Sequence, residues 1–199
     1  PIIIFFFLAE YFILGKISYL QMHDFSEDIF PRYFNLWSNA LNSGFNYWSV
    51  NIGTGQDRLS NLVYYDNLMP ILMGFIPNWI AYQIYIIITT GLGIYGFYKY
   101  LSIRSESEYL ISVLSALIFP VIVSILNSPG LSLGLQYLPF TIFLLYKIQN
   151  QDITPVYKLA EITIVLYINS IMMSFTLGYV YVLPFLLFWY FIVEKFNLK

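Results

Sequence analysis

Long apolar runs separated by short polar connectors constrain this sequence more than any other feature. A helix that crosses a bilayer needs about 20 consecutive, mostly apolar residues. The 199-residue chain offers six candidates: Pro1–Leu20, Asn78–Leu101, Tyr109–Asn127, Leu131–Ile148, Leu159–Leu177 and Val180–Val193. Hydrophobic residues make up 59% of the chain and charged residues only 10%, against about 45–50% and 25% in soluble domains. The sequence therefore predicts an all-α, polytopic transmembrane helical bundle of about six spanning helices.

The remaining composition excludes several kinds of site. The chain has no cysteine, so it forms neither a disulfide nor a thiolate metal site. Nine basic and eleven acidic residues leave a net charge of -2, without the basic patch that is typical of nucleic-acid binding. Pro1 already lies within an apolar run. We therefore expect a piece of a longer protein, with residues 1–199 forming a single membrane domain.

The positions of the basic residues predict an orientation in the membrane. The longest connector, residues 21–77, holds five of the eleven acidic residues. If this loop is extracytoplasmic, six basic residues fall on the cytoplasmic side: Lys99, Arg104, Lys147, Lys158, Lys195 and Lys199. Only His23, Arg32 and Arg58 then lie outside, with Lys16 near the outer end of the first helix. Because this asymmetry follows the positive-inside rule, we expect an integral plasma or inner membrane protein with its long first loop outside.

Two segments of the loop 21–77 have helical character. Leu59–Pro77 is long enough to span, but Asp66 and two prolines argue against a lipid-exposed helix. We expect this segment to stay outside or to be re-entrant. Asp28–Ser43 has the periodicity of an amphipathic helix lying along the membrane surface. Its apolar face consists of Phe30, Tyr33, Phe34, Trp37 and Leu41.

Three carboxylates, Asp24, Glu27 and Asp28, come directly after the first predicted span. This position places them at the outer membrane surface, where lipid-linked substrates present their headgroups. A carboxylate there can take a proton from an acceptor hydroxyl or hold a divalent metal beside a phosphate. The alternative is that Asp28 caps the surface helix and the other two acids are solvated. The residues alone favour that alternative.

Other polar residues are weaker candidates. Arg58 and Arg32 can bind a lipid phosphate through paired hydrogen bonds, or serve as interfacial anchors. Asp66 is either functional or exposed at the end of a surface helix. Gly53–Asp57, with the sequence GTGQD, lacks the Gly-Lys-Ser/Thr ending of a phosphate-binding loop, so it predicts a turn.

A few polar residues lie inside the predicted spans. Glu10 would be near mid-bilayer, where it faces protein or stays protonated. Asn169, Ser170 and Ser174 are able to form hydrogen bonds between helices. We interpret the many aromatic residues as packing residues and as an interfacial belt.

The order of these features resembles the C-type superfamily of multi-pass membrane glycosyltransferases, whose first external loop carries an essential Asp or Glu. More narrowly, it is similar to the bacterial YfhO-like membrane proteins, implicated in glycosylating cell-surface polymers. Five stretches carry the resemblance: DIFPRYFNLWSNALNSGFNYWSVNIGTGQD, YYDNLMPILMGFIPNW, GLGIYGFYKYL, LQYLPFTIFLLYKI and SFTLGYVYVLPFLLFWYFI. In that family an Asp is followed four residues later by a polar residue and Tyr. Asp28 precedes Arg32 and Tyr33 in this way, although Arg32 stands where Gln is expected.

The resemblance implies transfer of a sugar from a polyprenyl-phosphate-linked donor to a cell-surface polymer or lipid acceptor. Asp28 would be the general base or an acceptor-orienting carboxylate, with Asp24 assisting. The residues expected to bind substrate are Glu27, Arg58, Asp66 and Tyr33. Metal dependence varies across the superfamily, so no cofactor is assigned and a divalent metal is left open. The other expected partners are membrane lipids, and no nucleic acid is expected.

Two further hypotheses stay open at this point. The chain could be a non-enzymatic polytopic transporter or flippase of lipid-linked saccharides, with Glu10 as a proton-coupling acid. It could also be a structural assembly subunit, in which Asp24–Asp28 is only a cap and a solvated turn.

Overall fold

The structure, a computed structural model, describes residues 9, 12–17, 41, 48–49, 56–57, 67–104, 135–172 and 184. The helical elements are η1 (Gly15–Ile17), α5 (Leu68–Phe75), α6 (Asn78–Arg104), η4 (Leu135–Tyr137), α8 (Leu138–Gln149) and α9 (Pro155–Met172). The two strands are β1 (Trp48–Ser49) and β2 (Gln56–Asp57). The described part of the chain is therefore helical apart from one pair of two-residue strands, in agreement with the predicted helical class.

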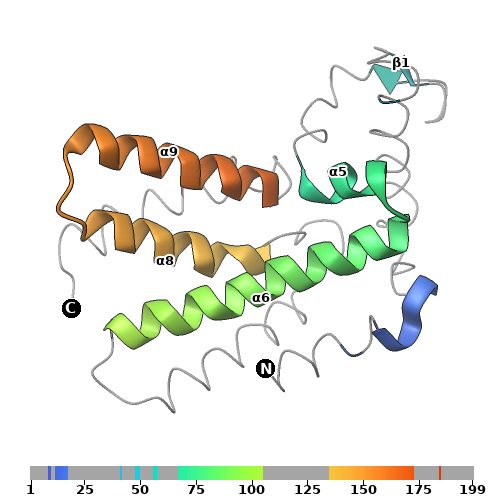
Figure 1. Cartoon of the computed structure of the whole chain (residues 1–199), viewed down its shortest axis with the longest axis horizontal. Coiled ribbons are helices and arrows are strands. Elements are labelled where there is room, and N and C mark those ends of the chain that lie inside the picture. The colour runs from blue at the N-terminus through green and yellow to red at the C-terminus, as the bar shows by residue number, and fades with distance from the viewer. Residues whose placement is uncertain are drawn as a thin grey trace.

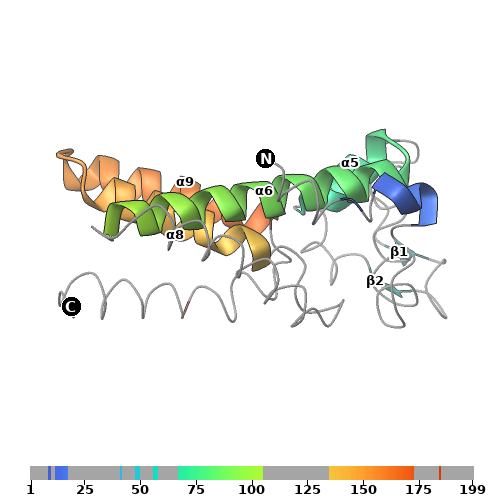
Figure 2. The same ribbon diagram turned by 90° about the horizontal axis from the view of Figure 1, so that it is seen from below.

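Among the described α-helices, α5 and α8 lie beside α6, the longest of them, and α9 lies beside α8 (Figure 1). Helices α6 and α8 run in the same direction, and α9 returns antiparallel to α8 after a short connection. Helix α5 lies beside the N-terminal half of α6. Seen from below, α5, α6, α8 and α9 form a single layer (Figure 2).

Helix α6 has the length that a membrane span requires. Its 27 residues extend over about 40 Å at 1.5 Å per residue, more than the roughly 30 Å of a bilayer's hydrocarbon core. The helix begins at Asn78 as predicted and ends at Arg104, three residues after the predicted end at Leu101. Among the described residues it is the one helix that is long and apolar enough to cross a membrane. The other five spans stay predictions.

The predicted span Leu131–Ile148 is wrong as a single continuous α-helix. The α-helix begins only at Leu138 and is preceded by the 3-10 turn η4. Pro139 lies in the first turn of α8, and it explains why the α-helix does not begin earlier in the chain. A proline has no N–H for the carbonyl four residues earlier, and its ring clashes with that carbonyl. The 12 residues of α8 extend over only about 18 Å.

The predicted span Leu159–Leu177 begins too late. Helix α9 begins at Pro155, because a proline is well tolerated at the first helical position, where its missing N–H has no partner in any case. The added turn brings Lys158 into the helix. Its ammonium group lies 2.9 Å from the Gln149 carbonyl oxygen at the end of α8 and donates a hydrogen bond to it. Residues after Met172 lie outside the described part of the chain.

The first predicted span, Pro1–Leu20, is interrupted. Phe12–Leu14 are α-helical, but the chain then enters the 3-10 turn η1 with Gly15 at φ +51°. This left-handed conformation is one that glycine adopts without a steric penalty and that ends α-helices. The side chain of Gln83 on α6 donates a hydrogen bond of 3.3 Å to the Gly15 carbonyl. The break therefore lies beside the N-terminal part of α6.

The segment predicted to be external or re-entrant, Leu59–Pro77, contains the short helix α5 (Leu68–Phe75). Its eight residues extend over about 12 Å, so α5 is too short to cross a membrane, as predicted. Buried Asn67 caps it by accepting a hydrogen bond of 3.0 Å from the Met69 N–H. Whether the whole segment is external or re-entrant stays a prediction. In the predicted surface helix Asp28–Ser43, the described residue is Leu41, which is helical and exposed.

Two glycines of α6 allow η4 and α8 to pack closely against this helix. A Cβ atom added at Gly93 would overlap the carbonyl oxygen of Gln136. A Cβ atom added at Gly96 would overlap the backbone of Phe140. Because only glycine leaves this space, the backbones of α6 and α8 are in direct contact along this seam. Further towards the helix ends, Leu145, Ile148 and Val165 form an apolar core between α8 and α9.

Candidate functional site

The six residues of the predicted catalytic site lie outside the described residues: Asp24, Glu27, Asp28, Tyr33, Arg58 and Asp66. Whether they share one cleft therefore stays a prediction. Chain connectivity does give the surroundings of two of them. Arg58 directly follows the last residue of β2, and Asp66 directly precedes Asn67, the cap of α5.

A pair of short strands lies within the long loop. Trp48 of β1 is paired with Asp57 of β2, and Ser49 with Gln56, in antiparallel register. The chain therefore reverses its direction between Ser49 and Gln56, as expected for a turn at Gly53–Asp57. The last two residues of that predicted turn belong to β2 instead.

The described helices bury several polar side chains. Buried positions on α6, η4, α8 and α9 include Gln83, Thr89, Thr90, Gln136, Thr141, Asn169 and Ser170. One of the contacts between helices is made by the hydroxyl group of the buried residue Tyr85, which donates a hydrogen bond of 2.6 Å to the backbone carbonyl of Met172. This bond joins α6 to the last residue of α9. Polar groups thus hold helices together in the interior.

The predicted hydrogen bond between helices is confirmed for Asn169. Its side-chain oxygen accepts a hydrogen bond of 2.7 Å from the hydroxyl of Thr141 on α8. The hydroxyl of Ser170 donates instead to the Tyr167 carbonyl of its own helix at 2.7 Å. Ser174 lies outside the described residues. The sequence reasoning missed Thr141 and Tyr85, although a hydroxyl group inside an apolar run is the signal that could have found both.

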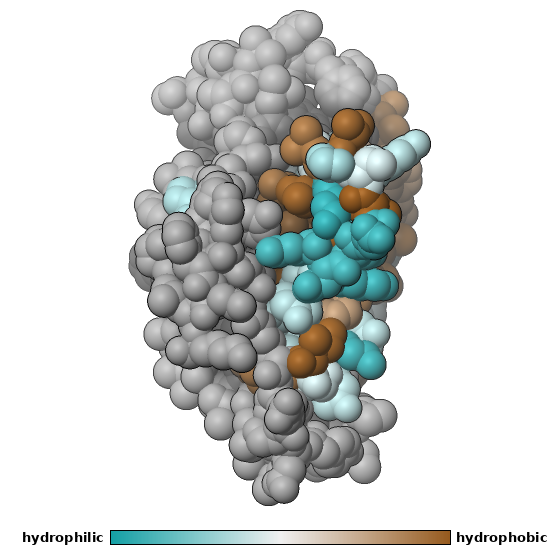
Figure 3. Space-filling view, turned by 90° about the vertical axis from the view of Figure 1, so that its left-hand side faces the viewer, coloured by the Kyte–Doolittle hydropathy of each residue, from teal (hydrophilic) through white to brown (hydrophobic). Residues whose placement is uncertain are grey.

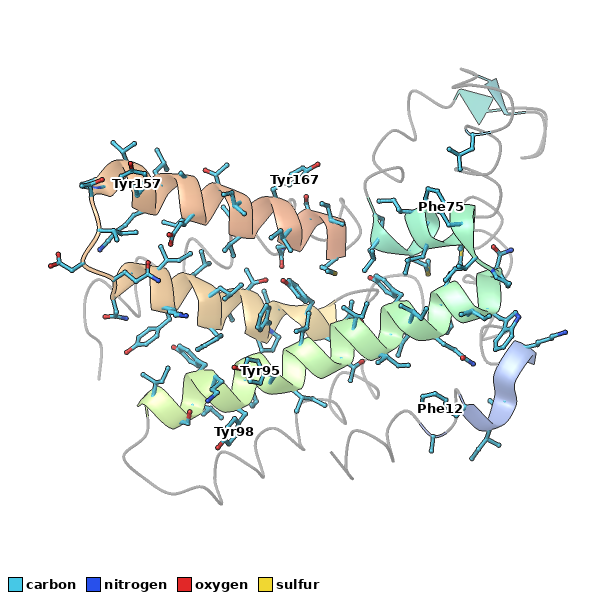
Figure 4. The ribbon with its side chains drawn as sticks, viewed as in Figure 1. Phe12, Phe75, Tyr95, Tyr98, Tyr157 and Tyr167 are labelled. Atoms are coloured by element: carbon cyan, nitrogen blue, oxygen red, sulfur yellow. The ribbon has the colours of Figure 1, made fainter. Side chains whose placement is uncertain are left out.

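The exposed surface of the described helices is strongly apolar. On α9, Val156, Tyr157, Leu159, Ile164 and Tyr167 are all more than half exposed. Figure 4 shows Tyr157 and Tyr167 on the side of α9 that faces away from α8. Ile103 of α6 and Phe75 of α5 are similarly exposed. These exposed apolar side chains lie on the same helices as buried polar ones such as Thr141 and Asn169, and buried polar side chains are the more informative of the two observations.

The described lysines lie at two opposite ends of the helices, three at one end and one at the other. Lys99, Lys147 and Lys158 all lie where α6 and α8 end and α9 begins, which we call the lysine end (Figure 1). Figure 3 faces this end and shows hydrophilic residues gathered over it. Lys16 lies at the opposite end, because its neighbour Gly15 contacts Gln83 near the start of α6. This separation is the one expected from the distribution of basic residues.

Within the described segments, no cluster of three or more His, Asp or Glu residues is placed to hold a metal ion. No protein-family model, curated protein or solved structure matches this chain.

Proposed function

We propose that the chain is a multi-pass integral protein of the plasma or inner membrane with about six spanning helices. The observation that carries this proposal is the combination of exposed apolar side chains on α9 with buried polar ones such as Thr141 and Asn169. In a bilayer, exposed apolar surface meets lipid at no cost, and hydrogen bonds between helices remain favourable. Helix α6, long enough to span, supports the same assignment.

The proposed orientation places the lysine end on the cytoplasmic side and residues 21–77 on the extracytoplasmic side. The separation of Lys99, Lys147 and Lys158 from Lys16 supports it, because loops on the cytoplasmic side carry an excess of Lys and Arg. The N-terminal end of α6 and the loop before it then share the outer surface.

Within this arrangement, we assign the chain a glycosyl transfer reaction. A sugar would move from a polyprenyl-phosphate donor to a cell-surface polymer or lipid acceptor on the outer face. Asp28 would take the proton of the acceptor hydroxyl, with Asp24 assisting. Since a sugar hydroxyl has a pKa far above neutral, the base acts as the bond to the lipid phosphate breaks. Support for this assignment comes from the sequence resemblance and from the position of the acids after the first apolar run.

The same proposal gives roles to the remaining site residues. The departing phosphate gains negative charge, and Arg58 would stabilise it. Glu27, Asp66 and Tyr33 would contact the substrates. The chain neighbours of Arg58 and Asp66 are held in place. Asp57, which precedes Arg58, pairs with Trp48, and Asn67, which follows Asp66, caps α5.

The alternative is a flippase or transporter of lipid-linked saccharides. The break in the first predicted span at Gly15 lies beside the N-terminal part of α6, whereas the discontinuous helices of transporters break near the bilayer midplane, in matching positions of two repeats. Loss of sugar transfer in an Asp28 variant would distinguish the two hypotheses, because a flippase forms no new glycosidic bond.

The decisive experiment compares Asp28→Asn and Asp24→Asn with the matched control Asp152→Asn, which alters an exposed acid in the connection between α8 and α9. Each variant is expressed in the full protein, its membrane insertion is verified, and transfer is measured with a panel of polyprenyl-phosphate sugars. We expect Asp28→Asn to lower the rate by at least about 100-fold, the lower range for loss of a general base. Equal rates in all three variants would exclude the catalytic assignment.

A further inference from the structure

Ring contacts between α6 and α8 hold together the two helix segments that carry Lys99 and Lys147 at the lysine end. Tyr95 of α6 packs edge-on against Phe143 of α8, with ring centroids 6.2 Å apart. Lys99 and Lys147 each come four residues later, on the same helix face and one turn nearer the end. Because α6 and α8 run in the same direction, the lysine pair repeats the Tyr95–Phe143 pair one turn further on.

A second ring pair holds the two helices together where the lysines emerge. Tyr100 and Tyr146 meet edge-on, with centroids 5.7 Å apart. Tyr100 directly follows Lys99, and Tyr146 directly precedes Lys147. The helix segments that carry the two lysines are therefore held together by packed rings.

The two lysines differ in what surrounds them. The Lys99 ammonium lies 5.9 Å from the ring centroids of both Tyr95 and Tyr98, within the range of a cation–π contact. Figure 4 shows Tyr98 on the side of α6 that faces away from α8. Lys147 is exposed. Within the part of the chain that the structure describes, neither lysine forms an ion pair with a carboxylate, so an anion from outside can balance the charge of each ammonium group.

We propose that Lys99 and Lys147 together bind the phosphate of an anionic phospholipid headgroup in the leaflet at the lysine end. Exposed Ile103 and Tyr157 border this end, and such surface suits acyl chains and the interfacial region rather than free solvent. Basic residues between membrane helices are known to hold anionic headgroups. This inference rests on the membrane part of the proposed function and does not depend on sugar transfer.

The test uses the full chain purified in a mild detergent, without sugar donor or acceptor. Binding of phosphatidylglycerol and of phosphatidylcholine with the same acyl chains is measured by native mass spectrometry. We expect Lys99→Gln/Lys147→Gln to lower the affinity for phosphatidylglycerol by roughly twentyfold, from about fivefold per lysine. Lys99→Arg/Lys147→Arg should keep the affinity because the charge is kept. The control Lys16→Gln, at the opposite end, should match the wild type.

Gel filtration verifies the fold of each variant. If the double glutamine variant does not stay monodisperse, Lys147→Gln alone alters an exposed side chain and should still lower the affinity about fivefold. Equal affinity in the glutamine variants and in Lys16→Gln would overturn the proposal. Full competition by millimolar inorganic phosphate would also overturn it, by identifying a free phosphate as the ligand. Inactivity in sugar transfer would leave the result of this assay unchanged.

Discussion

The hydroxyl of Thr141 donates a hydrogen bond of 2.7 Å to the side-chain oxygen of Asn169, and both residues are buried between α8 and α9. Thr141→Val keeps the shape of the side chain but leaves the Asn169 oxygen without this donor. We expect the free energy of unfolding to fall by about 1 kcal/mol, within the range measured for such bonds in membrane proteins.

The measurement is unfolding by sodium dodecyl sulfate in mixed micelles, followed by circular dichroism. Thr163→Val is the matched control, because exposed Thr163 bonds only to the Leu159 carbonyl of its own helix. In a double-mutant cycle, Thr141→Val should cost little in the background of Asn169→Leu. Independent, additive effects of the two substitutions would contradict this prediction.

Gly93→Ala and Gly96→Ala should both separate α6 from α8. Each added methyl group would overlap backbone atoms, the Gln136 carbonyl in one case and Phe140 in the other. Since backbone cannot rotate away as a side chain does, we expect losses of about 2–3 kcal/mol in the free energy of unfolding. Gly91→Ala is the control, because its Cβ would meet nothing within 4 Å, and it should be neutral or stabilising by up to about 1 kcal/mol.

Gly15→Val should lower the free energy of unfolding because of the backbone conformation at Gly15, and not because of a steric clash. No atom lies within 4 Å of an added Cβ, but φ is +51°, a region that costs an L-residue about 1–2 kcal/mol. Gly15→Asn should cost less, because Asn adopts this conformation more readily. Equal losses for Val and Asn in the same unfolding assay would show that φ is not the cause.

The orientation can be tested by labelling, because the chain has no cysteine of its own. In intact cells, a membrane-impermeant maleimide should label Lys16→Cys but not Asp152→Cys. Permeabilisation should make Asp152→Cys reactive, since Asp152 is exposed in the connection between α8 and α9. Labelling of both sites in intact cells would contradict the spanning arrangement. Labelling of Asp152→Cys alone would reverse the orientation.

Much of the helical content could be predicted, because the preference of a segment for lipid depends on its own residues. The start of α6 at Asn78 follows from the apolar run that begins there. The shortness of α5 follows from the polar and proline residues around Leu59–Pro77. The errors fall where a local rule overrides the apolar pattern. Pro139 delays the start of α8, Pro155 advances the start of α9, and Gly15 interrupts the first run. The proposed catalytic acids still depend on sequence reasoning, since they lie outside the described residues.

The sequence by itself determined that this chain carries long apolar segments, that its acids gather in one loop, and that its lysines are unevenly distributed. Only the tertiary structure decided which surfaces meet. Gly93 and Gly96 lie at the contact between two helices because α8 packs parallel to α6. Asn169 accepts its hydrogen bond from Thr141 rather than from another hydroxyl. The helix segments that carry Lys99 and Lys147 are brought together by the ring contact of Tyr95 and Phe143. The physical reason is that burial in lipid is a property of each segment, whereas partner choice depends on the shapes and hydrogen-bonding groups of residues distant in the sequence.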